Sequence, residues 1–172
     1  SPNMPTLETA AVYPGMVLLE GTTLSEGRGT TRPFEIFGAP WLDPYAYAEA
    51  LEAEGLAGCR FRPMYFTPTF QKHAGHLCGG VQVHVEDRRA LDAFRLGVAA
   101  IACAHRLAPT EKMWRDPPYE YVADKPPIDI LFGSDALRSA IASGQSVAAI
   151  AAGWSEDVAT FEKARRPTLL YP

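Results

Sequence analysis

The chain of 172 residues is 47% hydrophobic and 21% charged, with a formal net charge of −4. This composition is typical of a globular domain, and the length suffices for one domain with a substantial core. Lysine and arginine form no basic stripe, which argues against a nucleic-acid partner, and no run of 18 apolar residues suggests a membrane span.

The chain has three cysteines, Cys59, Cys78 and Cys103, and no C-x-x-C pair. The odd number and the spacing argue against a zinc site and a disulfide framework. We expect buried thiols, with a Cys59–Cys78 disulfide as the alternative if the protein is exported. The sequence starts at Ser1-Pro2 without an initiator methionine or a signal peptide, and we interpret it as part of a longer protein.

The first predicted elements are a short helix and a strand. Thr6 is expected to cap a helix over residues 7–12, which Pro14 prevents from continuing. The apolar run Met16–Leu19 then predicts a buried strand. A polar loop, residues 20–32, follows that strand.

A second helix is predicted to begin at Asp43-Pro44, where a capping carboxylate precedes a proline, and to end at Gly55. Residues 59–66 alternate and predict a strand, in which Pro63 indicates an edge or a bulge. Residues 81–85 alternate with period two and predict a further strand, with its valines on one face and Gln82 and His84 on the other.

Asp87 is expected to cap the longest helix, over residues 88–107. A proline-punctuated connector, residues 109–127, follows it. Three serines, Ser134, Ser146 and Ser155, are expected to cap successive short helices. Residues 168–171 are expected to add a last strand. Strands interspersed with helices predict an α+β (mixed α/β) fold, a single domain with a small mixed β-sheet packed against several helices.

The polar loop over residues 20–32 holds most of the candidate site residues. Its side chains are Glu20, Thr22, Thr23, Ser25, Glu26, Arg28, Thr30, Thr31 and Arg32, and glycines stand at 21, 27 and 29. Glycines allow close approach of backbone to a ligand, and binding groups concentrate on loops held by a rigid scaffold. The alternative is a solvated turn whose charges pair with one another, such as Glu26 with Arg28 or Glu20 with Arg32.

A second polar segment, residues 72–80, begins with Lys72 and His73. A histidine with an ordinary pKa near neutrality can donate to a sugar oxygen or shuttle a proton, although a bland surface histidine is the alternative. His84 faces either a cleft or the underside of a helix. The four histidines lack H-x-x-x-H and H-E-x-x-H spacing, so no metal is expected, and no phosphate-binding motif indicates a cofactor.

Five stretches of the sequence resemble the exo-β-N-acetylmuramidase family, formerly filed as a domain of unknown function. They are S-P-N-M-P-T (1–6), V-Y-P-G-M-V-L-L-E-G-T-T-L-S-E-G-R-G-T-T-R-P-F (12–34), G-A-P-W (38–41), K-H-A-G-H-L-C-G-G-V-Q-V-H-V-E-D-R (72–88) and P-I-D-I-L-F-G-S-D (127–135). Members release N-acetylmuramic acid from the ends of peptidoglycan fragments. One departure is Thr23, where the family's pattern leads us to expect asparagine.

The resemblance covers residues 1–172 as the C-terminal domain only, and it implies a Rossmann-like N-terminal domain that is absent from this chain. The active site is expected in the cleft between the two. The partners implied are peptidoglycan-derived muramyl sugars and that N-terminal domain, and the implied location is extracytoplasmic, periplasmic or secreted.

Glycoside hydrolysis usually needs two carboxyl groups, so the catalytic candidates are Glu26, Glu20 and His73. N-acetylmuramic acid carries a lactyl carboxylate, which a guanidinium can bind with two hydrogen bonds. Arg28 is the first choice for that contact and Arg32 the second. The other candidates for substrate binding are Ser25, Thr23, Thr30, Lys72 and His84.

We therefore expect the substrate-binding part of an exo-acting glycoside hydrolase, which on its own is inactive. The alternative is a non-catalytic carbohydrate-binding or scaffolding domain, and a self-sufficient hydrolase using Glu20 and Glu26 ranks last. The leading hypothesis requires Glu26 and His73, from segments far apart in sequence, to face one common pocket.

Overall fold

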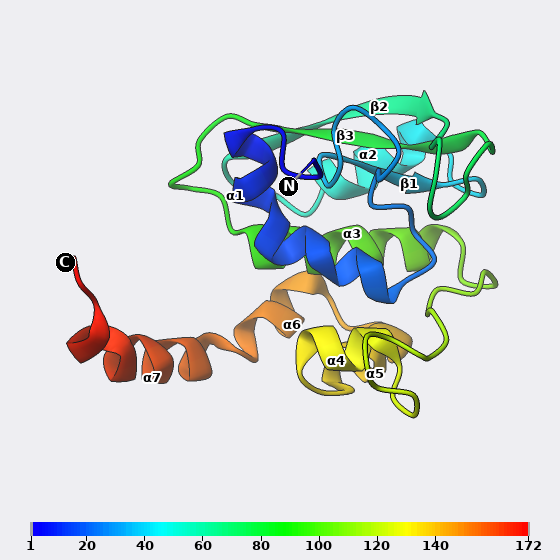
Figure 1. The fold of residues 1–172 in the computed structure, drawn as a ribbon. Coiled ribbons are helices and arrows are strands. Elements are labelled where there is room, and N and C mark those ends of the chain that lie inside the picture. Colours follow the sequence, from blue (N-terminus) through cyan, green and yellow to red (C-terminus); the bar gives the residue numbers. More distant parts are fainter. Residues whose placement is uncertain (1, 172) are drawn as a thin grey trace.

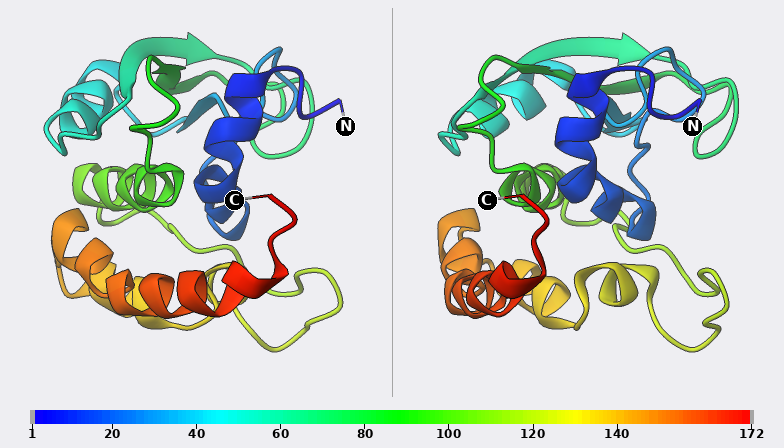
Figure 2. Two further views of the ribbon diagram at one scale, coloured as in Figure 1. Left: turned by 90° about the vertical axis from the view of Figure 1, so that its left-hand side faces the viewer. Right: turned by 60° about the vertical axis from the view of Figure 1, so that its left-hand side comes forward.

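The computed structural model describes residues 2–171, which stack in three layers (Figure 1). A β-sheet lies at the top, helix α3 (Ala93–Leu107) forms the middle, and the C-terminal helices lie beneath (Figure 2). Helix α1 (Leu7–Met16) runs from the level of the sheet down to that of α3, against which it packs. Helix α2 (Pro44–Glu52) packs against both the sheet and α3. The predicted α+β class is confirmed. In the described part of the chain no helix is long and apolar enough to cross a membrane.

The sheet has three strands in the order β1 (Ile36–Ala39), β3 (Cys78–Val85), β2 (Cys59–Phe66). Both strand pairs are antiparallel, so the sheet is not mixed as predicted. The reason is the link between β2 and β3, which contains no helix and reverses the chain directly. The predicted strands over 59–66 and 81–85 are confirmed.

The two faces of the sheet follow the alternation in the sequence. Phe61 lies opposite Val83, and both are buried, whereas Arg62 lies opposite Gln82 on the outer face and donates to its side-chain oxygen at 2.8 Å. Pro63 is tolerated because β2 is an edge strand, as expected.

The predicted strand over Met16–Leu19 is wrong. Helix α1 continues through Pro14 to Met16, and a 3₁₀ helix, η1 (Val17–Gly21), follows. A short apolar run does not distinguish a buried strand from a buried helix. The helix survives Pro14 because it packs tightly on α3: a Cβ added at Gly97 would lie 2.2 Å from the carbonyl oxygen of Gly15.

Helix α3 begins at Ala93, five residues later than predicted. Its N-cap is Asp92, which accepts from the backbone N–H of Arg95 at 2.9 Å. Asp87, the expected cap, instead accepts from the N–H of Arg89 in the preceding turn. Residues 96–104 of the helix are all buried, so it forms the centre of the core.

Four short helices close the molecule: α4 (Pro127–Phe132), α5 (Ala136–Ala142), α6 (Val147–Ala152) and α7 (Ser155–Arg165). Ser146 caps α6 as predicted, by accepting from Ala149 N–H at 3.2 Å. Ser134 and Ser155 do not occupy cap positions, because α5 begins after Asp135 and α7 after Trp154. The predicted strand over 168–171 is wrong, since a 3₁₀ turn, η2 (Arg166–Thr168), and irregular chain stand there.

The three cysteines are free thiols and are buried, as expected. Burial raises the pKa of Cys59 and Cys78 to about 11 and that of Cys103 to about 12. They are therefore protonated, inert core groups at neutral pH.

Candidate functional site

A cavity of about 640 Å³ opens where three separate segments of the chain meet. The segments are the loop that follows η1, the turn between β2 and β3, and the connector between α3 and α4. The lining residues are Glu20, Thr22, Thr23, Glu26, Arg28, Gln71, Lys72, His73, Arg115, Tyr119 and Glu120.

The connector is held against the loop by main-chain hydrogen bonds. Thr23 N–H donates to the carbonyl of Met113 at 2.8 Å, and Arg115 N–H donates to that of Gly21 at 3.1 Å. The Thr23 hydroxyl adds a bond to the carbonyl of Lys112 at 2.6 Å. The position of the connector, the third segment that lines the cavity, is thus fixed by main-chain hydrogen bonds. These bonds do not depend on the identity of most of its side chains.

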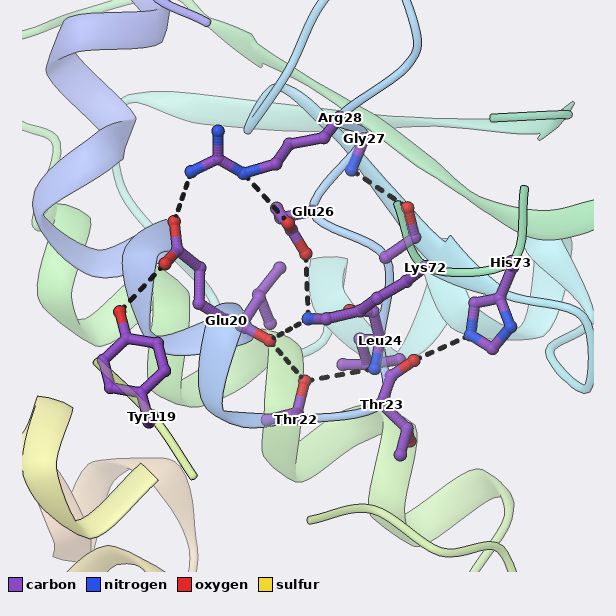
Figure 3. A network of polar contacts seen from close by, with 12 residues as sticks. Glu20, Thr22, Thr23, Leu24, Glu26, Gly27, Arg28, Lys72, His73 and Tyr119 are labelled. Atoms are coloured by element: carbon purple, nitrogen blue, oxygen red, sulfur yellow. Dashed lines mark hydrogen bonds and ion pairs between the residues drawn. The ribbon is translucent and has the colours of Figure 1, made fainter. Parts of the chain in front are cut away.

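Lys72 ties the turn to the loop (Figure 3). Its ammonium group donates to the carbonyl oxygens of Leu19 at 2.7 Å and Leu24 at 2.9 Å, and to Glu26 Oε2 at 2.9 Å. An ammonium has three N–H donors, so these three contacts use all of them. Lys72 therefore acts as a structural cation at the base of the pocket.

Arg28 lies between two carboxylates (Figure 3). Its Nη2 donates to Glu20 Oε1 at 2.6 Å, and its Nε lies 3.1 Å from Glu26 Oε1. The second oxygen of Glu20 accepts from the Tyr119 hydroxyl at 2.9 Å. Phe34 lies under the guanidinium, with its ring centre 5.1 Å from Cζ. The charges of the loop thus do pair with one another, but they do so around a cavity.

The pKa values reflect this network. Burial acts to lower the pKa of Arg28, but the hydrogen bond and charge of Glu20, joined by Glu26, outweigh it and the pKa is raised. Burial lowers the pKa of Lys72, the charge of Glu26 opposes that shift, and the positive charge of Arg115 adds to it. Burial, then Glu20, raises the pKa of Tyr119 to about 12.

His73 reaches the pocket from the same turn as Lys72. Its Nε2 lies 2.7 Å from the carbonyl oxygen of Thr23, and since a carbonyl only accepts, Nε2 carries the hydrogen. Within residues 2–171 no group pairs with Nδ1. A neutral His73 thus presents one nitrogen acceptor that is free for a ligand.

Left-handed backbone concentrates around this cavity. The non-glycine residues with positive φ in the described chain are Phe34 (65°), Gln71 (67°), His73 (59°) and Glu120 (51°). Gln71, His73 and Glu120 line the cavity, and Phe34 lies beneath Arg28. Each such residue costs of order 1–3 kcal/mol, and strain of this kind clusters at functional sites.

Six of the ten predicted site residues line this one cavity: Glu20, Thr23, Glu26, Arg28, Lys72 and His73. The structure therefore brings together the two segments on which the prediction depended. Whether these residues perform the roles assigned to them stays a prediction.

The other four do not line the cavity. Ser25 is buried and caps the N–H of Gly27 at 3.1 Å, and Thr30 donates to the carbonyl of Gly27 at 2.6 Å, so both shape the loop. Arg32 pairs with the buried Glu35 at 3.5 Å and, together with His84, lines a different hollow. Arg32 binds Glu35 because the chain turns at Arg32, whose carbonyl accepts from Ile36 N–H at 3.0 Å.

Three residues of the connector were missed as site residues: Arg115, Tyr119 and Glu120. The sequence indicated only a proline-punctuated connector over residues 109–127. Nothing in its spacing predicts the backbone pairing with the loop, and Tyr119, which follows two prolines, was the one available signal.

This arrangement is suited to binding a polar ligand. Both oxygens of Glu20 and both of Glu26 accept hydrogen bonds or ion pairs within the protein. Arg28 occupies the space between these carboxylates, where a glycosidic bond would lie if they formed an acid–nucleophile pair. No group of three histidine, cysteine or acidic side chains among residues 2–171 is placed to hold a metal ion.

Comparison with known proteins gives a consistent result. A family model described as exo-β-N-acetylmuramidase NamZ, C-terminal, matches residues 11–171. The chain is 41% identical over 171 residues to the peptidoglycan β-N-acetylmuramidase NamZ of Bacillus subtilis (strain 168), and the match covers 99% of this chain and 39% of that protein.

Two crystal structures of DUF1343 family proteins from Bacteroides fragilis have the same fold. One superposes with a TM-score of 0.83 at 26% identity, covering 100% of this chain and 44% of that one. The other has a TM-score of 0.69 at 29% identity, covering 99% and 43%. The chain thus spans less than half the length of each of these relatives.

Proposed function

The chain belongs to the family of C-terminal domains of exo-β-N-acetylmuramidases, and from this premise we propose that it supplies the substrate-binding wall of such an enzyme's active site. The observation that carries the proposal is the cavity in which loop residues 20–28 and turn residues 71–73 meet. The ligand is the terminal N-acetylmuramic acid of a peptidoglycan fragment.

The cavity has the properties that a sugar site requires. Its volume of about 640 Å³ lies in the usual range for ligand pockets, about 300–1,000 Å³. Hydroxyl, carboxylate, amide and imidazole groups of its lining offer both donors and acceptors to sugar hydroxyls. The network around Arg28 and Lys72 holds these groups in place before a ligand arrives, which reduces the entropic cost of binding.

We assign Glu20 and Glu26 to positioning and not to proton transfer. Glu26 is only 3% exposed and is bonded to Lys72 and Arg28, so it fixes the cations of the pocket. His73, with Nδ1 unpaired in the described chain, is the group we assign to a direct contact with the sugar. The catalytic carboxyl group then comes from outside this chain.

The remaining part of the site comes from an N-terminal Rossmann-like domain in this proposal. Support comes from the B. subtilis relative, of which the matched region is only 39%, and from the resemblance of the sequence. Because the substrate is a cell-wall fragment, we place the protein outside the cytoplasm, where it serves cell-wall turnover.

A second candidate function is a carbohydrate-binding or scaffolding domain without a catalytic role. It is favoured by one observation, the full engagement of both Glu20 and Glu26 by other groups of the protein. A domain that only binds needs no free carboxyl group in its pocket.

Hydrolysis of a chromogenic N-acetylmuramide by the 172-residue chain and by the native protein that carries it separates these functions. We expect hydrolysis by the native protein only. Hydrolysis by the chain alone, abolished in Glu26→Gln, would establish a self-sufficient hydrolase and contradict the proposal. Binding of N-acetylmuramic acid by a native protein that hydrolyses nothing would favour the binding domain.

A further inference from the structure

Three cationic side chains line the cavity in the described chain, and two of them are occupied. Arg28 is bound by Glu20 and Glu26, and Lys72 uses its three donors on two carbonyls and Glu26. Diverting either of them to a ligand would break an ion pair with Glu26, which is only 3% exposed, and this is destabilising. Neither cation is therefore well placed to bind an additional anion.

Arg115 is the cavity's third cation, and it differs from the other two. Its side chain is exposed, and no carboxylate among residues 2–171 lies within ion-pair distance of its guanidinium. Its backbone is nevertheless fixed, because Arg115 N–H donates to Gly21 O at 3.1 Å. An arginine with a fixed backbone and free donors at the edge of a cavity is equipped to recognise an anion.

The aromatic ring of Tyr119 orients this arginine. The guanidinium carbon of Arg115 lies 5.8 Å from the centre of the Tyr119 ring, and the Tyr119 hydroxyl is bonded to Glu20 at 2.9 Å. Stacking on a ring leaves the in-plane N–H groups of a guanidinium free to bind a carboxylate with two parallel bonds. The chain of contacts Arg28–Glu20–Tyr119–Arg115 thus connects the occupied cation to the free one.

The charged lining of the cavity leaves Arg115 without an ion-pair partner in the described part of the chain. Glu20 and Glu26 hold Arg28 and Lys72, and Glu120, the third acidic residue of the lining, forms no ion pair with Arg115. The positive charge of Arg115 contributes to lowering the pKa of Lys72, so these two cations repel each other across the cavity. An anion bound at Arg115 would relieve that repulsion.

We propose that Arg115 binds the lactyl carboxylate of the muramyl residue and so makes the site prefer N-acetylmuramic acid over N-acetylglucosamine. The inference rests on the proposed function, and it moves this contact from Arg28 and Arg32, which hold carboxylates of the protein, to a residue of the connector. Two parallel N–H···O bonds between guanidinium and carboxylate distinguish the two sugars, because the lactyl group is absent from N-acetylglucosamine.

The test compares the affinities of three ligands for wild type and for variants of the native protein that carries this chain. Affinities are measured for N-acetylmuramic acid, its methyl ester, in which the charge is removed, and N-acetylglucosamine. The variants are Arg115→Ala and Arg115→Lys, with Arg89→Ala, an exposed arginine outside the cavity, as the matched control.

We expect Arg115→Ala to weaken binding of the acid about 10- to 100-fold, the range of a hydrogen-bonded charge pair, and to leave the ester and N-acetylglucosamine unchanged. Arg115→Lys keeps the charge but loses the paired geometry and gives an intermediate loss. Arg89→Ala binds all three ligands as wild type does.

Two results would overturn the inference alone: a wild-type preference for the acid that survives in Arg115→Ala, or an equal loss for all three ligands. A wild-type protein that binds none of the three sugars would overturn the proposed function as well. The ester distinguishes the carboxylate from the rest of the lactyl group, since it keeps the lactyl carbons and replaces the charged oxygen by a neutral methoxy group.

Discussion

Lys72 is the residue on which the geometry of the pocket depends most. It is a nearly buried cation that satisfies two main-chain carbonyls of the loop and one carboxylate, Glu26. The Leu19 carbonyl, in η1, also accepts from Thr22 N–H at 3.0 Å, whereas Leu24 lies in the irregular loop that follows. A single ammonium thus links these two carbonyls to Glu26 and supplies a hydrogen bond to main chain outside regular secondary structure.

The pKa of Tyr119 leads to a pH-dependent prediction. It is raised to about 12 from an ordinary value of 10, first by burial and then by Glu20. A group with a raised pKa in the folded state contributes stability that is complete below pH 10 and is lost as the pH rises toward 12. We expect Tyr119→Phe to be less stable than wild type by about 1 kcal/mol at pH 8, a value reduced for partial exposure, and this difference to shrink above pH 10.

Urea unfolding midpoints of the two proteins between pH 8 and pH 11 check this expectation. Tyr121→Phe is the matched control, because Tyr121 is 100% exposed two residues away, and it should differ from wild type at no pH in this range. A Tyr119→Phe difference that stays constant across the range would contradict the raised pKa.

At the residue level, the sequence predicted the members of the cavity better than their contacts. The density of charge in residues 20–32 and the pair Lys72-His73 were sufficient to place six of the candidates together. The choice between Arg28 and Arg32 depended on a turn at Arg32 that directs its side chain to Glu35. Tertiary pairing of this kind has no signature in local spacing.

At the scale of elements, the site depends on how the turn between β2 and β3 docks on the loop. Gly29 is the point of contact: its carbonyl accepts from Thr69 N–H at 3.0 Å. A Cβ at Gly29 would lie 2.7 Å from the nitrogen of Phe70 and 2.8 Å from that of Thr69, and its φ is +84°. The position thus requires glycine both for its backbone angle and for the close approach of two main chains.

We expect Gly29→Ala to push these two segments apart. Gly75→Ala is the matched control, because Gly75 lies in the same turn with φ +77° and nothing within 4 Å of an added Cβ. Left-handed strain costs each variant about 1–2 kcal/mol, and the clash adds about 1–3 kcal/mol to Gly29→Ala alone.

Urea unfolding measures the two stabilities, and titration with N-acetylmuramic acid measures the pocket. Gly29→Ala should lose affinity, because Lys72 moves away from Glu26 and His73 from the carbonyl of Thr23, whereas Gly75→Ala should retain it. Equal stability losses in the two variants would show that the contact between the segments is not tight.

The elements that the sequence predicted correctly are those with a local cause. Helix α2 has an Asp43-Pro44 start, and β2 and β3 have alternating side chains. The errors fall where a tertiary contact decides: α1 passes through Pro14 because Gly15 lies against α3. Likewise the N-cap of α3 is Asp92 and not Asp87, although both are acceptable caps.

At the scale of the whole molecule, the cavity is lined by residues 20–28, the turn between β2 and β3, and the connector. Helix α7 extends from the lowest layer (Figure 1). Helix α7 has no buried residue. The buried side chains of the lowest layer are aliphatic and come from α4, α5 and α6. A partly buried aromatic cluster adjoins them, in which the Trp154 ring lies 5.2 Å from that of Phe94 in α3 and 6.5 Å from that of Phe132. We therefore expect residues after Trp154 to contribute little to the free energy of unfolding of the domain.

Deletion of residues 159–172 tests this boundary. We expect the free energy of unfolding to change by no more than about 0.5 kcal/mol, because the side chains of residues 159–171 are exposed, with Phe161 64% and Leu170 90% accessible. Trp154→Ala in the undeleted chain should cost about 2 kcal/mol, less than a fully buried aromatic. Urea midpoints measure both changes, and a deletion as damaging as Trp154→Ala would mean that α7 stabilises the lowest layer through contacts of its exposed face.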